Sequence, residues 1–226
     1  MKRHANLLLA STVLALSTLP AVADTKVTMH EGSELIGDAS ELPEGMRQAF
    51  ENQKPTTAVY WFGEDRAARI GQLGSMISRL DRGETYIVND LKKSYSVIKM
   101  DGAEDSGALS GTAELVATGE TRKIGSWSAT RYDMTVTMAG DEPADVTLWV
   151  SDEVEVDLSA YHAIIRATAS RMGSEWMLRY LELDGFPVRQ EFRMGPILSW
   201  QEVVAIEDAS PPPGIYGPPS GYTEAD

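Results

Sequence analysis

The chain has 226 residues, 20 basic and 34 acidic side chains, a formal net charge of −14 and no cysteine. The missing cysteine excludes disulfides, thiolate nucleophiles, thiolate metal sites and a lipidated N-terminal cysteine. The negative charge repels nucleic acid and anionic lipid headgroups, so nucleic acid is not an expected partner.

The first 23 residues have the pattern of a cleaved export signal. Lys2 and Arg3 precede an apolar run over residues 7–19, and residues 21–23 (AVA) form a small-x-small cleavage site. That run is shorter than the roughly 20 residues that a membrane-spanning helix needs. We therefore expect a signal peptide over residues 1–23, cleavage after Ala23, and a periplasmic protein that is not membrane-anchored.

The rest of the chain is expected to form one β domain over residues 24–209 and a tail over residues 210–226. Cleavage removes Lys2 and Arg3 and leaves 18 basic and 34 acidic residues, a formal charge of −16. The remaining length suffices for one hydrophobic core. Five prolines and three glycines in the tail predict an extended surface segment outside the sheet.

Short alternating segments rich in Thr, Val, Tyr, Ile and Trp predict antiparallel strands. In residues 131–138, Tyr132, Met134, Val136 and Met138 alternate with polar residues, so one face must meet a core. Asp184-Gly185 suits a two-residue hairpin turn between strands over 178–183 and 186–193. The expected strands are residues 26–30, 58–62, 67–73, 75–81, 85–89, 94–100, 113–118, 122–126, 131–138, 146–151, 178–183, 186–193 and, as the last regular element, 197–206.

Two helices are expected between these strands. In Leu158–Met172 apolar residues recur at steps of three and four, Asp157 is placed to cap the start, and Gly173 is placed to end the helix. Residues 43–52 begin with a proline and carry Met46, Ala49 and Phe50 on one side, which predicts a shorter helix.

Catalytic signatures are missing from the sequence. His30 and His162 are the histidines left after cleavage, and a Gly-x-Ser-x-Gly elbow is absent. The acidic residues 152–157 lack the glycine of a calcium loop. We expect no metal, no cofactor and no enzymatic activity. An enzyme would require His30 or His162 beside a carboxylate in a cleft.

Large apolar residues are the other prominent feature. They are typical of an ordinary core, or of an apolar pocket between a curved sheet and a covering helix, and both interpretations stay open here. The candidate pocket residues are Trp61, Tyr132, Met134, Val136, Trp149, Tyr161, Ile165, Met172 and Phe192.

Several short motifs, in this order, resemble those of periplasmic outer-membrane lipoprotein-carrier-like (LolA/LolB-like) proteins and of a related exported family of unknown function. They are residues 61–73 (WFGEDRAARIGQL), 86–95 (YIVNDLKKSY), 118–132 (TGETRKIGSWSATRY), 148–151 (LWVS), 185–188 (GFPV) and 215–222 (IYGPPSGY). The resemblance implies a half-closed antiparallel barrel with a helical lid, whose apolar interior holds acyl chains in the carriers.

Together these observations predict a mainly β (α+β) fold, a strongly curved antiparallel sheet or half-barrel with the Leu158–Met172 helix on its concave face. The expected function is non-catalytic binding of an apolar or lipid-like ligand, or of a lipidated protein segment, in the periplasm. The alternative is an envelope protein–protein interaction module with a packed core, whose sheet edge or tail meets a partner protein.

Overall fold

The computed structural model describes residues 23–40, 42–99, 111–138, 143–155 and 157–225. Within them the chain is mainly β: a twelve-stranded, open and curved sheet with a helix on its concave face, which confirms the expected fold class. The signal peptide expected over residues 1–23 lies outside the described residues, apart from Ala23.

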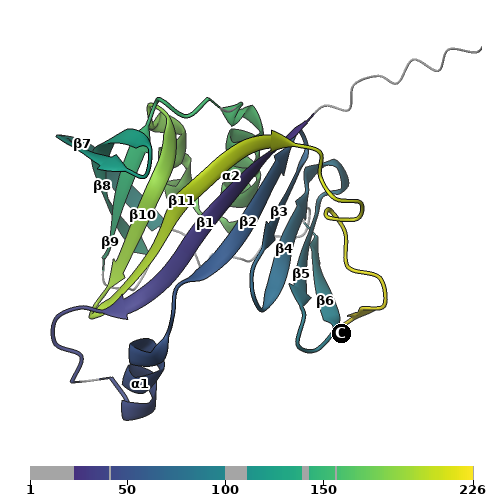
Figure 1. Cartoon of the computed structure of the whole chain (residues 1–226), viewed down its shortest axis with the longest axis horizontal. Coiled ribbons are helices and arrows are strands. Elements are labelled where there is room, and N and C mark those ends of the chain that lie inside the picture. Colours follow the sequence, from purple (N-terminus) through teal and green to yellow (C-terminus); the bar gives the residue numbers. More distant parts are fainter. Residues whose placement is uncertain (1–22, 41, 100–110, 139–142, 156, 226) are drawn as a thin grey trace, which may run out of the picture.

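The sheet consists of two meanders that meet at its centre (Figure 1). β1 pairs with β2 on one side and with β11 on the other, and the order is β12-β6-β5-β4-β3-β2-β1-β11-β10-β9-β8-β7. The strands are β1 (Asp24–Leu35), β2 (Thr56–Gly63), β3 (Arg66–Ile70), β4 (Gly74–Arg79), β5 (Glu84–Asn89), β6 (Ser94–Lys99), β7 (Gly111–Ile124), β8 (Trp127–Met138), β9 (Ala144–Ser151), β10 (Phe186–Met194), β11 (Ile197–Ala209) and β12 (Thr223–Glu224).

The expected long helix is confirmed as α2 (Leu158–Met172). The side chain of Asp157 accepts a hydrogen bond from the Ser159 N–H at 2.9 Å, which satisfies one free donor at the start of the helix. Gly173 ends the helix in the left-handed conformation, with φ 62°. Both signals are local, so the sequence alone places this helix correctly.

The expected hairpin around Asp184-Gly185 is wrong. Its first strand is instead a 3-10 helix, η4 (Glu175–Glu182), and β10 pairs with β9 and β11. Trp176, Tyr180 and Leu183 recur at steps of four and three, and they pack on the apolar face of β8 and β9. The packing of these helically spaced side chains on the sheet therefore decides the conformation, although Asp184-Gly185 predicts a hairpin turn.

The two strands expected over residues 113–118 and 122–126 form one long strand, β7. Gly119 adopts φ 77° where the pairing with β8 is irregular, between Ala117 and Thr121. The glycine allows a local distortion within the strand, whereas the sequence suggested a break.

The C-terminal tail departs from the expectation that it lies outside the sheet. Thr223 pairs with Ser94, so β12 is a short parallel strand beside β6, and β11 is not the last regular element. Tyr216 is buried against Trp61 on the convex face, and its hydroxyl donates to Asp24 Oδ2 at 2.6 Å. β12 contains no proline, so its backbone can pair. The tail is therefore part of the fold.

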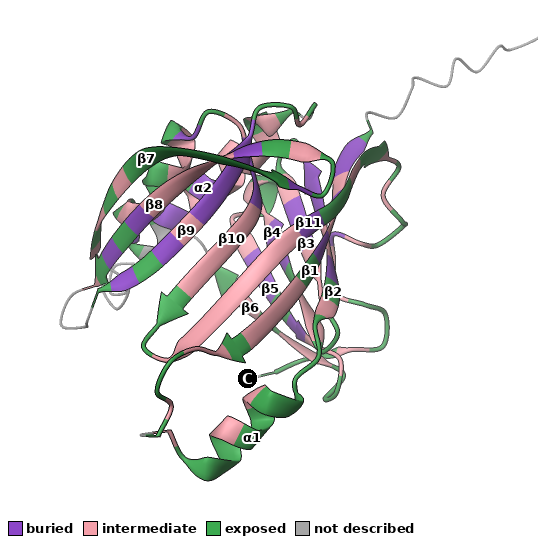
Figure 2. Ribbon diagram, turned by 60° about the vertical axis from the view of Figure 1, so that its left-hand side comes forward, coloured by how far each residue is buried: buried purple, intermediate pink, exposed green. Residues whose placement is uncertain are grey.

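The shorter expected helix is confirmed as α1 (Glu44–Asn52), with Pro43 as its N-cap residue. It has no buried residue and lies beyond the ends of β1 and β11 (Figures 1 and 2). In contrast to α2, it does not cover the sheet.

Candidate functional site

The concave face has two ends, because α2 covers only one of them. Alternate residues of a strand point to the same face, so Val27, Met29 and Glu31 of β1 share the concave side. Val27 and Met29 lie in the core that α2 packs against and are 0% and 5% exposed, whereas Glu31 lies farther along the strand, toward α1. We term the two regions the covered end and the open end.

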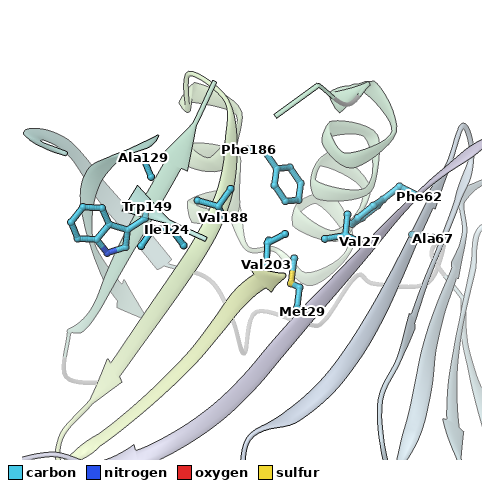
Figure 3. Close-up of a cluster of buried hydrophobic side chains, with 10 residues drawn as sticks. All are labelled: Val27, Met29, Phe62, Ala67, Ile124, Ala129, Trp149, Phe186, Val188 and Val203. Carbon is cyan, nitrogen blue, oxygen red and sulfur yellow. The ribbon is translucent and has the colours of Figure 1, made fainter. Parts of the chain in front are cut away.

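The covered end is filled with side chains. The Tyr161 ring of α2 lies 5.8 Å from that of Phe62 and 5.2 Å from that of Phe186, centroid to centroid. Val27 and Val203 complete this layer below the helix (Figure 3). The apolar space expected between helix and sheet is thus occupied by the protein's own core.

Two adjoining hollows lie at the open end. The larger has a volume of about 890 Å³ and is lined by residues of β3, β4 and β5 and by the segment that joins α1 to β2. The smaller, of about 390 Å³, is lined by residues of β1, β10 and β11 and by Tyr180 of η4. Glu31, Gln53 and Thr56 line both, so the two hollows lie side by side across these residues, and we term them together the groove.

One wall of the larger hollow is apolar and exposed. Met76 and Ile87 are direct partners across β4 and β5, point to the concave side and are 46% and 41% exposed. Leu73, in the turn before β4, extends this surface. We term Leu73, Met76 and Ile87 the apolar wall.

A polar cluster forms the floor between the hollows. Glu31 Oε1 accepts hydrogen bonds from Tyr60 Oη at 3.0 Å, from Gln201 Nε2 at 3.0 Å and from Arg69 Nε at 3.3 Å. Arg69 Nη2 forms an ion pair with Glu31 Oε2. Arg69 Nε also donates to Tyr60 Oη at 3.0 Å. Because the charges of Glu31 and Arg69 cancel, this floor is polar but electrically neutral.

Tyr60 stays protonated in this cluster. Burial, and then the negative charge of Glu31, raise the pKa of the Tyr60 phenol to about 12. Its hydroxyl therefore acts as a hydrogen-bond donor to Glu31 across the physiological pH range.

The smaller hollow is lined mainly by uncharged polar groups. Ser33 Oγ and Ser199 Oγ lie 3.0 Å apart across β1 and β11. The Tyr180 hydroxyl donates to Gln190 Oε1 at 3.1 Å. Phe192 adds aromatic surface, whereas the Trp200 ring lies on the convex face, against Gly32 and the Arg189 guanidinium. Hydroxyl and amide groups both donate and accept, so this lining suits a polar, uncharged ligand group.

The residues predicted to line an apolar pocket are distributed over several clusters. Phe192 lines the smaller hollow. Trp61 lies on the convex face below Tyr216. Tyr132, Met134 and Val136 lie in the cluster covered by η4.

The remaining predicted residues belong to α2, apart from Trp149, which lies in β9. Tyr161 and Ile165 belong to α2, where Tyr161 packs in the covered end and Ile165 is buried. Trp149 is buried below the guanidinium of Arg122, 3.7 Å from the ring centroid. The side chain of Met172 lies outside the described residues.

The sequence prediction missed the open end. In the sequence, the open end is marked by a charged residue that follows an apolar residue two positions later, on the same face of a strand. Met29–Glu31 and Ala67–Arg69 are the two examples. The pairing of β1, β2 and β3 then brings these charges together. The sequence does not show which strands are neighbours, so this signal was not interpretable on its own.

The two histidines that the structure describes, His30 and His162, lie outside the linings of both hollows. His30 is exposed. Burial, together with the nearby Arg166, lowers the pKa of His162. Among the residues that the structure describes, no group of three or more His, Asp or Glu side chains could hold a metal ion.

No described helix is long and apolar enough to cross a bilayer. A family described as a domain of unknown function (DUF4412) matches residues 64–222, and the chain belongs to this family. No curated protein matches the sequence.

Among the solved structures that are similar to this chain are two with low sequence identity. PNGF-II has a TM-score of 0.43 and 11% identity, with 90% of this chain and 31% of PNGF-II covered. This chain thus spans less than a third of PNGF-II. The lipoprotein LppX of Mycobacterium tuberculosis has a TM-score of 0.37 and 12% identity, with 79% of this chain and 84% of LppX covered.

Proposed function

We propose that this member of the DUF4412 family is an exported, soluble periplasmic protein that binds an apolar or lipid-like ligand without catalysis. The ligand lies at the open end of the concave face. The observation that carries this proposal is the apolar wall beside the larger hollow. Apolar chains of the ligand would cover Met76 and Ile87, as α2 covers Val27 and Met29 at the other end.

The size of the groove supports this proposal. The larger hollow, at about 890 Å³, lies in the range of small-molecule sites, which is roughly 300–1,000 Å³. Burying apolar surface contributes about 25 cal/mol per Å², so a single acyl chain laid on this wall would provide the main affinity. The polar cluster next to the wall provides hydrogen-bonding groups for the other end of an amphipathic ligand.

The alternative function, an interaction module with a packed concave face, explains less of the structure. A module of that kind has no need for two hollows or for exposed Met76 and Ile87 on the concave side. Of its two expected contact sites, the C-terminal tail is fixed in the fold through Tyr216 and β12, whereas a sheet edge remains at β7. Ligand binding at the open end accounts for these features together.

Binding of the uncharged apolar dye N-phenyl-1-naphthylamine tests the proposal. We expect the wild-type protein to bind the dye and Ile87→Asp to weaken binding at least about tenfold, because a carboxylate on the wall would have to be desolvated. Leu91→Asp is the matched control, since Leu91 is 78% exposed in the turn after β5 and does not line the hollow.

The control decides how the result is interpreted. Unchanged binding by Leu91→Asp supports the open end as the site. Equal weakening by both variants, or no dye binding by the wild-type protein, would contradict the proposal. Circular dichroism and urea unfolding of each variant confirm that the fold is retained.

A further inference from the structure

We propose that the smaller hollow binds an uncharged, hydroxyl-rich head group, so that the ligand as a whole is a neutral amphiphile. This inference rests on the proposed function, which places the apolar chain against the wall of the larger hollow. It adds the chemical class of the head group and the side chains that recognise it.

The lining of the smaller hollow consists mainly of hydroxyl and amide side chains. Ser33, Ser199, Gln190, Gln201 and Tyr180 present hydroxyl and amide groups to the smaller hollow. Each of these groups donates and accepts hydrogen bonds, which matches the mixed donors and acceptors of a polyhydroxylated ligand. An anion would use only the donors.

The lining of the smaller hollow also carries no net charge that would attract an anion. Glu31 is the charged residue among those that line the smaller hollow, and it is already paired with Arg69. A phosphate or sulfate placed there would meet the acidic Glu31 and no unpaired cation of the lining. The exposed Lys54 lines the larger hollow and does not line the smaller one. The site therefore selects against anionic head groups.

The polar side chains of the smaller hollow are held in defined orientations. Tyr180 donates to Gln190 Oε1 at 3.1 Å, which orients the amide so that its Nε2 donors remain for a ligand. The Phe192 ring provides apolar surface beside the polar groups. A ring that carries hydroxyls at its edge and C–H groups on its faces satisfies both kinds of surface.

The smaller hollow adjoins the larger one. The two hollows share Glu31, Gln53 and Thr56, so a molecule that extends across these residues reaches both hollows. The head group and the chain then lie on either side of the polar cluster. Gln201 and Tyr60 of this cluster hydrogen-bond with Glu31 and hold the floor in place.

Displacement of the dye by amphiphiles that share a dodecyl chain tests the head-group preference. The ligands are dodecyl maltoside, dodecyl phosphocholine and dodecyl sulfate, all kept monomeric, and maltose alone. We expect dodecyl maltoside to bind at least about tenfold more tightly than dodecyl sulfate. Gln190→Leu should weaken dodecyl maltoside about three- to tenfold, the effect of one lost hydrogen bond, and leave dodecyl sulfate unchanged.

The outcomes separate this inference from the proposed function. If all three amphiphiles bind equally, or dodecyl sulfate binds most tightly, the head-group inference is wrong and the apolar site stands. If maltose binds as tightly as dodecyl maltoside, the head-group subsite stands and the role of the apolar wall is overturned. If neither the dye nor an amphiphile binds, both are overturned.

Discussion

The covered end and the open end of the concave face share strands β1, β2, β3, β10 and β11, yet they differ in what lies over them. At the covered end, Val27 and Phe62 are buried below α2. A few residues farther along, the same face carries Glu31 and Arg69, and β5 adds the exposed Ile87. The groove therefore results from a helix that covers only part of a curved sheet, and not from a gap in the core.

The largest expected effect tests whether the covered end is the structural core. Phe186 is 2% exposed and packs on Tyr161. We expect Phe186→Ala to lower the free energy of unfolding by about 3–5 kcal/mol, through lost burial and the cavity it leaves. Ile87→Ala, at the open end, should lower it by less than about 1 kcal/mol. Urea unfolding measures both, and equal losses would contradict the distinction.

A second effect concerns the convex face behind the open end, which the C-terminal tail covers. Tyr216 packs with Trp61 and Ile77 and donates to the buried carboxylate of Asp24. We expect Tyr216→Ala to cost about 2–4 kcal/mol of unfolding free energy and Tyr216→Phe about 1–2 kcal/mol, since the second removes only the hydrogen bond. Differential scanning calorimetry measures both; no change in either variant would show that the tail is not part of the core.

The smallest effect concerns the polar cluster at the open end. Between pH about 10 and 12 the unfolded chain loses the Tyr60 proton while the folded chain keeps it, because the pKa of Tyr60 is raised from 10.0 to about 12. Its contribution to stability is therefore complete below pH 10 and is lost as the pH rises through 12.

Unfolding at alkaline pH measures this contribution. Tyr60→Phe should show a shallower fall in unfolding free energy between pH 10 and 12 than the wild-type protein. A residual fall is expected, because burial also raises the pKa of Tyr161 and Tyr180. An identical pH dependence in the variant would contradict the coupling of Tyr60 to this cluster.

The sequence predicted those parts of the fold whose signals are local. The cap at Asp157, the apolar spacing of α2 and Gly173 lie within one segment, and the alternation in β8 is complete within its own strand. The η4 segment was mistaken for a strand because Asp184-Gly185 resembles a hairpin turn. The packing of Trp176 and Tyr180 on β8 and β9, which decides its conformation, is not visible in the local sequence.

The open end could not be predicted for a related physical reason. Glu31, Tyr60, Arg69 and Gln201 come from four strands, and their meeting depends on the order in which the strands pair. Trp61, by contrast, was predicted as a pocket residue, and alternation places it on the opposite face from Tyr60. Predicting the face of a strand requires knowledge of what each side of the sheet packs against.

The most direct test of the central claim is to locate a bound acyl chain on the protein. The photoreactive residue p-benzoylphenylalanine replaces Ile87 on the concave side in one variant and Val116, which is 49% exposed on the opposite face of β7, in another. After irradiation with a tritiated fatty alcohol, we expect the label to attach to the Ile87 variant and not to the Val116 variant. Equal labelling of the two variants, or labelling of the Val116 variant alone, would contradict binding at the open end.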